Sequence, residues 1–157
     1  MPTGDDLRSL MRHFPSGVSV VTVDADGDRI GVTMGSLVSL SLEPPLVGIA
    51  VGKDNALHEL LRSAGAFGVS LLRGDQAHVA ARFALGMPPL MLWQGVDVRV
   101  GTTGAPLLAT ALGWLECRVH AEHEVGDHTL FVGEVVNVEE GEPGTGLVYR
   151  EHGYHPV

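Results

Sequence analysis

The feature that most constrains the fold of this chain is a pair of long strand-like segments towards its C-terminal end. Residues 111–121 and 128–138 are rich in β-branched and other apolar side chains, and a Gly126-Asp127 turn sequence lies between them. Because two such runs pair readily when a short glycine-containing turn joins them, the sequence predicts a long antiparallel hairpin. A hairpin of this length favours an architecture dominated by antiparallel sheet.

Shorter segments elsewhere repeat the pattern of strands separated by turns. Residues 18–23 and 29–34 flank an Asp26-Gly27 turn sequence and predict a second hairpin. Further strands are predicted at 46–51, 67–72 and 146–149, and short helices are predicted after Asp5, at 56–63 after Asn55, and at 76–83 after Asp75, with 86–94 irregular. About seven strands and three helices predict a mainly β fold with short helices, built as a closed or partly closed antiparallel barrel.

The composition limits the class of protein further. The 157 residues are 45% hydrophobic and 18% charged, which is typical of a globular chain that buries a substantial core. The 21 glycines and 9 prolines favour many turns and short strands. No linker or internal repeat divides the chain, so we expect one domain over residues 1–157.

The net charge bears on the kind of partner, and the cysteine content bears on the cellular compartment. Acidic residues outnumber basic ones by 19 to 10, for a net charge of −9, which argues against a nucleic-acid partner because phosphate binding needs clustered Lys and Arg. Cys117 is the only cysteine, and no leader-like or membrane-length apolar run is present. We therefore expect a cytoplasmic protein without a membrane partner.

Residues 31–46 form the most unusual stretch, because hydroxyl groups lie among apolar residues with almost no charge. Ser36, Ser39 and Ser41 would lose free energy if their hydroxyls were buried without partners. The stretch is either a serine-rich turn that leads into a strand or a cradle for a polar, planar ligand. In the second case Gly35 would allow the ligand to approach the backbone closely.

Other candidate binding groups follow this stretch. Asn55 at a helix start offers free N–H groups to an anion, and Lys53 adds a positive charge, although a solvated lysine beside an ordinary N-cap is the commoner arrangement. Arg82 and Phe83 are either a phosphate contact with an apolar lid or a surface arginine beside a core phenylalanine. His128, at the turn of the long hairpin, is either a ligand contact or a solvated loop histidine.

No pattern in the sequence predicts a metal site or a nucleophile. The pairs His120/His123 and His152/His155 fall in strand or tail segments, where residues three apart point to opposite faces. Dinucleotide-binding, Walker-type and Gly-x-Ser-x-Gly motifs are absent. Cys117 lies in the middle of a predicted strand, as a core cysteine does.

Taken in order, these segments resemble the flavin reductase-like family. Residues 14–22 are similar to the family's Phe-x-x-Gly-Val-x-Val-Val-Thr, and residues 31–46 are similar to its Gly-x-Thr-x-x-Ser-x-x-Ser-x-Ser-x-x-Pro-Pro-Leu. Asp75-Gln76 with Arg82-Phe83-Ala84, then Gly126-Asp127-His128, then Leu147-Val148-Tyr149 with Gly153-Tyr154 follow in the family's order. The resemblance covers nearly the whole chain.

The resemblance implies an antiparallel split β-barrel of the FMN-binding type, and a homodimer with the flavin near the dimer interface. It implies reduction of FMN or FAD by NADH or NADPH, with the reduced flavin supplied to a monooxygenase. The implied cofactor contacts are Thr33, Met34, Gly35 and Ser36 along the isoalloxazine, Ser39 and Ser41 near the ribityl chain and phosphate, Lys53, Asn55, Arg82 and Phe83 further along, and His128 and Tyr154 at the nicotinamide. His128 is the implied catalytic residue, as an orienting group. Many relatives carry Asn at the position of Gly35, so this chain lacks that side-chain donor.

Hydride transfer between the two cofactors needs orientation and electrostatics from the protein and no acid–base dyad, which agrees with the motifs found. Two alternatives remain at the level of sequence. The same barrel could hold FMN tightly for electron transfer without catalysing flavin reduction. An oxidase acting on pyridoxamine phosphate would need a basic phosphate clamp, which ten Lys and Arg in all leave little room for.

Overall fold

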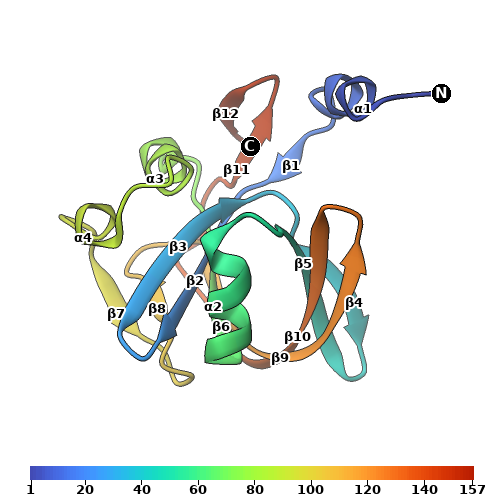
Figure 1. The fold of residues 1–157 in the computed structure, drawn as a ribbon. Coiled ribbons are helices and arrows are strands. Elements are labelled where there is room, and N and C mark those ends of the chain that lie inside the picture. Colours follow the sequence, from blue (N-terminus) through green and yellow to red (C-terminus); the bar gives the residue numbers. More distant parts are fainter.

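The computed structural model describes residues 1–157 and is built mainly from antiparallel strands (Figure 1). The helices are α1 Gly4–Met11, α2 Ala56–Ala64, α3 Ala77–Phe83 and α4 Pro89–Leu92. The strands are β1 Ser16–Gly17, β2 Ser19–Ala25, β3 Asp28–Met34, β4 Val38–Leu42, β5 Pro45–Gly52, β6 Ala66–Leu71, β7 Val98–Val100, β8 Pro106–Leu108, β9 Gly113–Val125, β10 His128–Glu140, β11 Leu147–Arg150 and β12 Gly153–Pro156.

One sheet of seven strands, in the order β3-β2-β6-β9-β10-β5-β4, organises the molecule. Every neighbouring pair in it is antiparallel. The predicted long hairpin is confirmed, because β9 and β10 are 13 residues each and pair from His128 opposite Val125 to Glu140 opposite Gly113. The predicted hairpin around Asp26-Gly27 is confirmed as β2 and β3. Two small sheets, β1-β11-β12 and β7-β8, complete the fold.

The main core lies where α2 packs against the large sheet (Figure 1). Asn55 begins this helix as predicted, since its side-chain oxygen accepts a hydrogen bond from the Leu57 N–H at 2.9 Å. Leu57 and Leu61 lie on one face of the helix and are fully buried. They belong to one cluster with Phe67 of β6 and Phe131 of β10. Burial of these large side chains provides the main driving force for folding.

A second apolar cluster fixes the two helices that follow β6. Phe83 of α3 and Leu92 of α4 are each 2% exposed and pack with Val20 of β2 and Leu108 of β8. The ring of Phe83 also meets Trp93 edge-on, with ring centroids 5.3 Å apart. This cluster places the α3–α4 segment beside β3.

A buried carboxylate ties the loop between β7 and β8 to the sheet. Glu116 of β9 is 1% exposed and has no basic partner. Instead it accepts four hydrogen bonds of 2.8–2.9 Å, from the Thr102 hydroxyl, the Thr103 N–H and hydroxyl, and the Asn137 amide. Burial alone would raise the pKa of this carboxyl group, but these donors outweigh it and lower the pKa to about 2.

Two predicted helix caps are wrong, each for a local reason. The cap of α1 is Thr3 and not Asp5, because the Thr3 hydroxyl and the Asp6 carboxylate form a reciprocal capping box. The residue before α3 is Gln76 and not Asp75. Its side chain accepts a hydrogen bond from the Arg73 N–H at 2.7 Å and donates one to the Thr110 carbonyl at 2.8 Å, so it links two loops.

The prediction of an irregular segment at 86–94 is corrected by α4, which begins at Pro89 after Pro88. The strand count also rises, because β1, β4, β7, β8 and β12 were not predicted. β4 lies inside the serine-rich stretch and pairs with β5, which the alternation of Val38, Leu40 and Leu42 with serine permits. None of the helices has the length and apolar character needed to cross a membrane.

Candidate functional site

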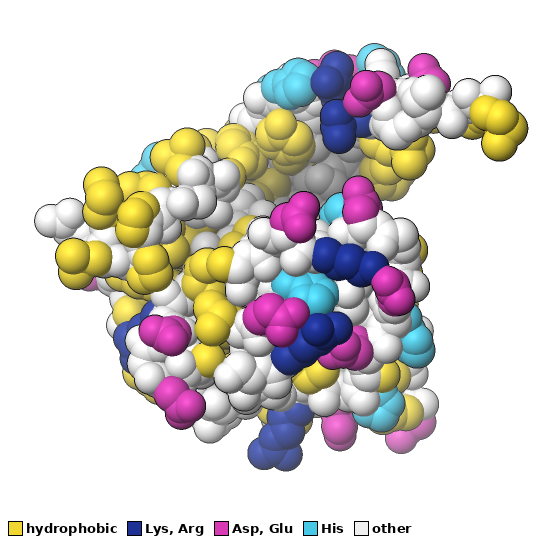
Figure 2. All heavy atoms as spheres, viewed as in Figure 1, with side chains coloured by type: hydrophobic (Ala, Val, Ile, Leu, Met, Phe, Trp, Pro, Cys, Tyr) yellow, Lys and Arg dark blue, Asp and Glu magenta, His cyan; other side chains and the backbone are white.

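The largest cleft near the predicted cofactor residues, which we call the main cleft, lies between β3, the start of α2 and the α3–α4 segment. It has a volume of about 620 Å³, within the usual range for small-molecule sites. Its apolar walls are built by Ile30, Val32, Leu60, Phe83, Met87 and Leu92. Figure 2 shows hydrophobic side chains gathered over α4 and beside α2 on this face of the molecule. Such walls suit a flat aromatic ligand.

The polar end of the main cleft is the N-terminus of α2. Asp54, Asn55 and Ala56 line it there, and Asn55 satisfies one of the free N–H groups of the first turn. The His58 N–H also has a partner, the Asn55 carbonyl at 3.0 Å. The Ala56 N–H and the helix dipole favour an anion at this end, where the Asp54 carboxylate acts against one. The main cleft thus offers apolar walls at one side and an anion-favouring helix end at the other.

A smaller cleft adjoins the main one at Ala84, which lines both. This tyrosine cleft has a volume of about 260 Å³ and is lined by Thr33, Met34, Gly35, Tyr149 and Tyr154 among others. The two tyrosine rings lie 5.1 Å apart between centroids, and burial raises the pKa of Tyr154. Four predicted site residues, Thr33, Met34, Gly35 and Tyr154, are therefore brought together by the fold.

The structure gives a physical reason for glycine at position 35. A Cβ atom built there would lie 2.6 Å from the Ser16 hydroxyl oxygen and 3.2 Å from the Ser16 Cβ. Ser16 of β1 thus occupies the space that a side chain at position 35 would need. The Thr33 hydroxyl donates a hydrogen bond to the Ala80 carbonyl at 2.6 Å, so this end of β3 is also tied to α3.

The three predicted serines lie outside both clefts. The Ser36 hydroxyl accepts a hydrogen bond from the Ala50 N–H at 3.1 Å and donates one to the Ala50 carbonyl at 3.2 Å. Ser39 and Ser41 are on β4, an edge strand of the large sheet, where Ser39 is exposed. Ser36 therefore has the internal partners that a structural role requires, whereas Ser39 and Ser41 remain open to a ligand.

Lys53 lies in a separate group of charged side chains above α2, visible at the centre of Figure 2. Its ammonium group pairs with Glu124 and thereby lowers the pKa of that carboxyl group. Arg62 pairs with Glu122 at 2.7 Å in the same group. Lys53 directly precedes Asp54 and Asn55, which line the main cleft, but its side chain pairs with Glu124 outside that cleft.

His128 occupies the exposed β9–β10 turn and lines neither cleft. Its Nδ1 lies 2.7 Å from an Asp127 carboxylate oxygen, and the imidazole lowers the pKa of Asp127. Its Nε2 lies 3.9 Å from the position that a Cβ atom on Gly52 would take. Within one chain, His128 and Tyr154 therefore belong to different surfaces.

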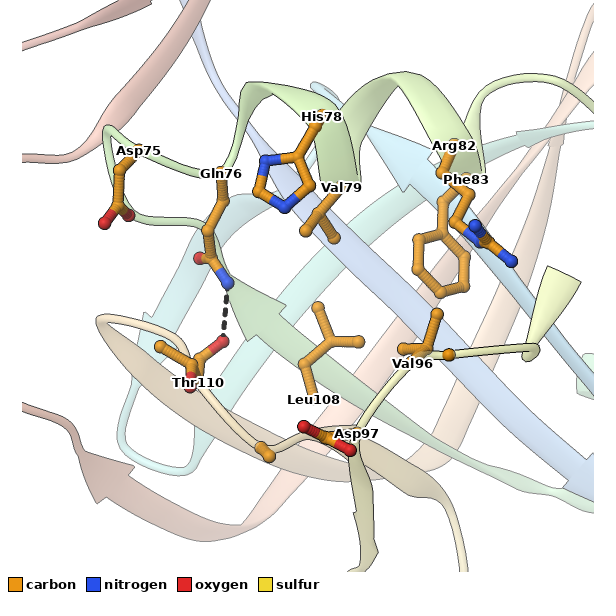
Figure 3. Close-up of a pocket in the computed structure, with 12 residues that line it drawn as sticks. Asp75, Gln76, His78, Val79, Arg82, Phe83, Val96, Asp97, Leu108 and Thr110 are labelled. Atoms are coloured by element: carbon orange, nitrogen blue, oxygen red, sulfur yellow. Dashed lines mark hydrogen bonds between the residues drawn. The ribbon is translucent and has the colours of Figure 1, made fainter.

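Arg82 and Phe83 at the end of α3 point to different surroundings (Figure 3). Phe83 lies between the main cleft and a second cleft of about 370 Å³, which we call the α3 cleft, and lines both. Arg82 lines only the α3 cleft, together with Asp75, His78 and Asp97 among others. The resemblance placed both residues along the cofactor, but only Phe83 reaches the main cleft.

Several lining residues of the clefts had no prediction. Met87, Pro88 and Leu92 come from the Met- and Pro-rich segment that was expected to be irregular. The signal in that segment was its apolar character directly after Arg82-Phe83. Ser16 and Tyr149 line the tyrosine cleft. The only indication in the sequence that they belong to a site is that both lie within segments similar to the family's motifs.

The titratable residues form no metal centre or reactive thiol in the structure. No group of three or more His, Cys, Asp or Glu side chains is arranged to hold a metal ion. Cys117 is fully buried, and burial raises the pKa of its thiol to about 12. The thiol is therefore protonated at neutral pH and is not a nucleophile.

Comparison with known proteins agrees with this geometry. Residues 11–157 match the family model described as a flavin reductase like domain. The chain is 42% identical over 146 residues to an NADH-dependent FAD reductase of Streptomyces globisporus, covering 91% of this chain and 80% of the relative. It is also 42% identical over 148 residues to the reductase component of a Thermus thermophilus 4-hydroxyphenylacetate 3-monooxygenase, covering 94% and 93%.

Solved structures show that the whole fold is shared. The NADH:FAD oxidoreductase SgcE6 of Streptomyces globisporus superposes with a TM-score of 0.94 at 38% identity, covering 100% of this chain and 95% of that one. BorF, the flavin reductase component of a bacterial two-component tryptophan halogenase, gives 0.91 at 36% identity, covering 99% and 98%. The predicted antiparallel split-barrel fold is thereby confirmed, and the chain belongs to the flavin reductase-like family.

Proposed function

We propose that this protein is a flavin reductase, which uses NADH to reduce FAD or FMN and supplies the reduced flavin to a partner flavin-dependent oxygenase. The observation that carries the proposal is the match of residues 11–157 to the family, together with the main cleft that the same residues build. Relatives described as an NADH-dependent FAD reductase and as the reductase component of a monooxygenase support both halves of the proposal.

The main cleft fits a flavin on its own geometry. Ile30, Leu60 and Phe83 offer apolar surface to a flat ring, and the N-terminus of α2 offers the Ala56 N–H and the helix dipole to a phosphate. A flavin, when bound, accepts hydride from a nicotinamide, and this chemistry belongs to the two cofactors. The residues of the chain bind and orient the rings and keep water away from the apolar walls.

We propose the roles of the site residues on the same basis. Thr33, Met34 and Gly35 present backbone and side-chain groups beside the main cleft, while Asn55 and Phe83 line it. Ser36, Ser39, Ser41, Lys53, Arg82, His128 and Tyr154 are the further residues that the family resemblance assigns to the cofactors. His128 is proposed to orient the nicotinamide, and its Nδ1 contacts the exposed carboxylate of Asp127.

A homodimer is part of the proposal, because apolar surface is left without a partner in one chain. Leu7, Leu10, Met11 and Phe14 are all exposed, and α1 buries none of its residues. Figure 1 shows α1 standing away from the large sheet. A second copy that covers such residues would remove this apolar surface from water.

We propose NADH as the donor rather than NADPH. Eight of the ten basic side chains are already held by carboxylates or carbonyl groups, and Arg12 and Arg118 are the two without such a partner. The 2′-phosphate of NADPH needs an available basic group, which this chain scarcely offers. Relatives named as NADH-dependent FAD and FMN reductases support this choice, whereas the flavin reductase HpaC, 28% identical, has been solved with NADP+.

The test is NADH or NADPH oxidation by the purified protein with FMN, FAD or no added flavin. We expect a protein that loses flavin on dialysis and oxidises NADH several times faster than NADPH only when flavin is added. A protein that stays yellow on dialysis and ignores NADH would instead support the alternative of a tightly bound, electron-transferring flavin.

A further inference from the structure

We propose that Arg82 is a positioning residue for the flavin: it holds the α4 wall of the main cleft in place and does not contact the flavin phosphate. This inference rests on the proposed function, since it assigns the main cleft to flavin. It differs from the role that the family resemblance gives Arg82, which is a direct contact to the cofactor.

The guanidinium group of Arg82 is committed to the backbone at the end of α4. Its Nε donates to the Leu92 carbonyl at 2.8 Å, and its Nη2 donates to the carbonyls of Met91 and Gln94 at 2.7 and 2.6 Å. These contacts use three of the five N–H donors of the side chain. One planar group therefore joins three acceptors that lie within four consecutive residues.

Two of the three acceptors, the Leu92 and Gln94 carbonyls, receive no backbone hydrogen bond, whereas the Met91 carbonyl also accepts the Gln94 N–H at 3.3 Å. The last carbonyl groups of a helix have no N–H donor within the helix. They usually accept a hydrogen bond from a side chain, from water or from a tightened last turn. α4 has only four residues, so its own hydrogen bonds cannot hold its position. Arg82 provides these carbonyls with charge-assisted donors from α3, which is itself anchored in the second apolar cluster through Phe83.

The segment that Arg82 holds forms one wall of the main cleft. Met87, Pro88, Pro89 and Leu92 line that cleft. Arg82 instead lines the α3 cleft, which is drawn in Figure 3 and shares Phe83 with the main cleft. Arg82 thus acts on the main cleft through the α4 backbone, and the residues that touch a ligand there are those of the wall.

A second link to the same wall makes the inference testable without changing a charge. The indole N–H of Trp93, the residue after α4, donates to the Arg29 carbonyl of β3 at 3.1 Å. Trp93→Phe removes this hydrogen bond and keeps an aromatic ring against Phe83. It should loosen the wall less than Arg82→Met does, because it removes one hydrogen bond instead of three.

The experiment compares FMN with riboflavin, which has the same ring system but no phosphate. Dissociation constants are measured by quenching of flavin fluorescence, and KM and kcat by NADH oxidation, for the wild type, Arg82→Met, Arg82→Lys and Trp93→Phe. Arg118→Met is the control, because Arg118 is exposed on β9 and its guanidinium group makes no hydrogen bond or ion pair in the fold. Circular dichroism and thermal melts confirm that each variant is folded.

We expect Arg82→Met to raise Kd and KM by about tenfold for FMN and by the same factor for riboflavin, with kcat changed less than about twofold, because three charge-assisted hydrogen bonds to the wall are lost. Arg82→Lys should restore little, since a lysine ammonium cannot reproduce the planar fork. Trp93→Phe should raise both constants by about threefold, the smaller effect expected of one neutral hydrogen bond. Arg118→Met should leave both unchanged.

Two results would overturn the inference. If Arg82→Met raised Kd and KM for FMN but not for riboflavin, and Arg82→Lys kept the wild-type values, Arg82 would contact the phosphate. Unchanged constants in a folded Arg82→Met protein would mean that the wall does not depend on it. If Arg82→Met fails to fold, Arg82→Lys and Trp93→Phe give the same comparison. Failure of the proposed function is separate, because the wild type would then not oxidise NADH in the presence of added flavin, whatever its affinity for FMN.

Discussion

The buried carboxylate of Glu116 gives the sharpest prediction about stability. In the folded protein its pKa is about 2, against about 4.5 for an ordinary glutamate. Because the pKa is lower in the folded state than in the unfolded state, the ionised group stabilises the fold at pH values above about 4.5. This contribution is lost as the pH falls from about 4.5 to about 2.

The size of the effect follows from the same two values. At about 1.4 kcal/mol for each pH unit between them, the ionised carboxylate contributes about 3 kcal/mol at neutral pH. Glu116→Gln replaces an acceptor-only group by one whose NH₂ faces existing donors, so at least part of the four-bond network is lost. We therefore expect the free energy of unfolding to fall by about 3 kcal/mol at pH 7.

Urea unfolding of the wild type and Glu116→Gln, measured between pH 7 and pH 3, checks both the size and the sign. The difference between the two proteins should be largest at pH 7 and should shrink below about pH 4.5. Glu134→Gln is the control, because Glu134 is an exposed residue of β10 with no side-chain partner. A Glu116→Gln protein as stable as the wild type, or a difference that does not change with pH, would refute the reasoning.

Three further expectations concern single sites. Gly133→Ala should lower the free energy of unfolding by about 1–3 kcal/mol in urea melts, since its Cβ would lie 2.6 Å from Phe67 Cζ and 2.9 Å from Cys117 Cβ. Asn55→Ala should cost about 1 kcal/mol in the same assay, because the Leu57 N–H loses its cap. The Cys117 thiol, whose pKa is about 12, should react with a disulfide reagent at pH 7 only after denaturant is added.

Local patterns were sufficient for the elements whose partners are adjacent in sequence. The β9–β10 hairpin follows from two apolar runs and a Gly126-Asp127 turn, and α2 follows from Asn55 and the leucines after it. These signals operate over a few residues, so the sequence displays them directly. The site residues at Thr33 to Gly35 were reached through matching motifs, and the fold places them beside Tyr154.

The unpredicted parts depend on partners distant in sequence. β1 is a strand only because β11 lies beside it, with Ser16 opposite Tyr149, more than a hundred positions along the chain. Whether Arg82 faces a ligand or the carbonyls of α4 depends on where α4 packs, which Leu92 and Trp93 decide through tertiary contacts. No local pattern around Arg82 contains that information.

The structure separates stability from binding in a way that the two main experiments can resolve. Glu116 lines neither the main cleft nor the tyrosine cleft, and its network holds the loop between β7 and β8. Arg82 holds α4, whose residues line the main cleft. Glu116→Gln should therefore lower the unfolding free energy while the flavin KM stays constant below the melting temperature. Arg82→Met should raise that KM in a protein that remains folded, because the hydrogen bonds it removes hold the wall of the main cleft and lie outside the Glu116 network.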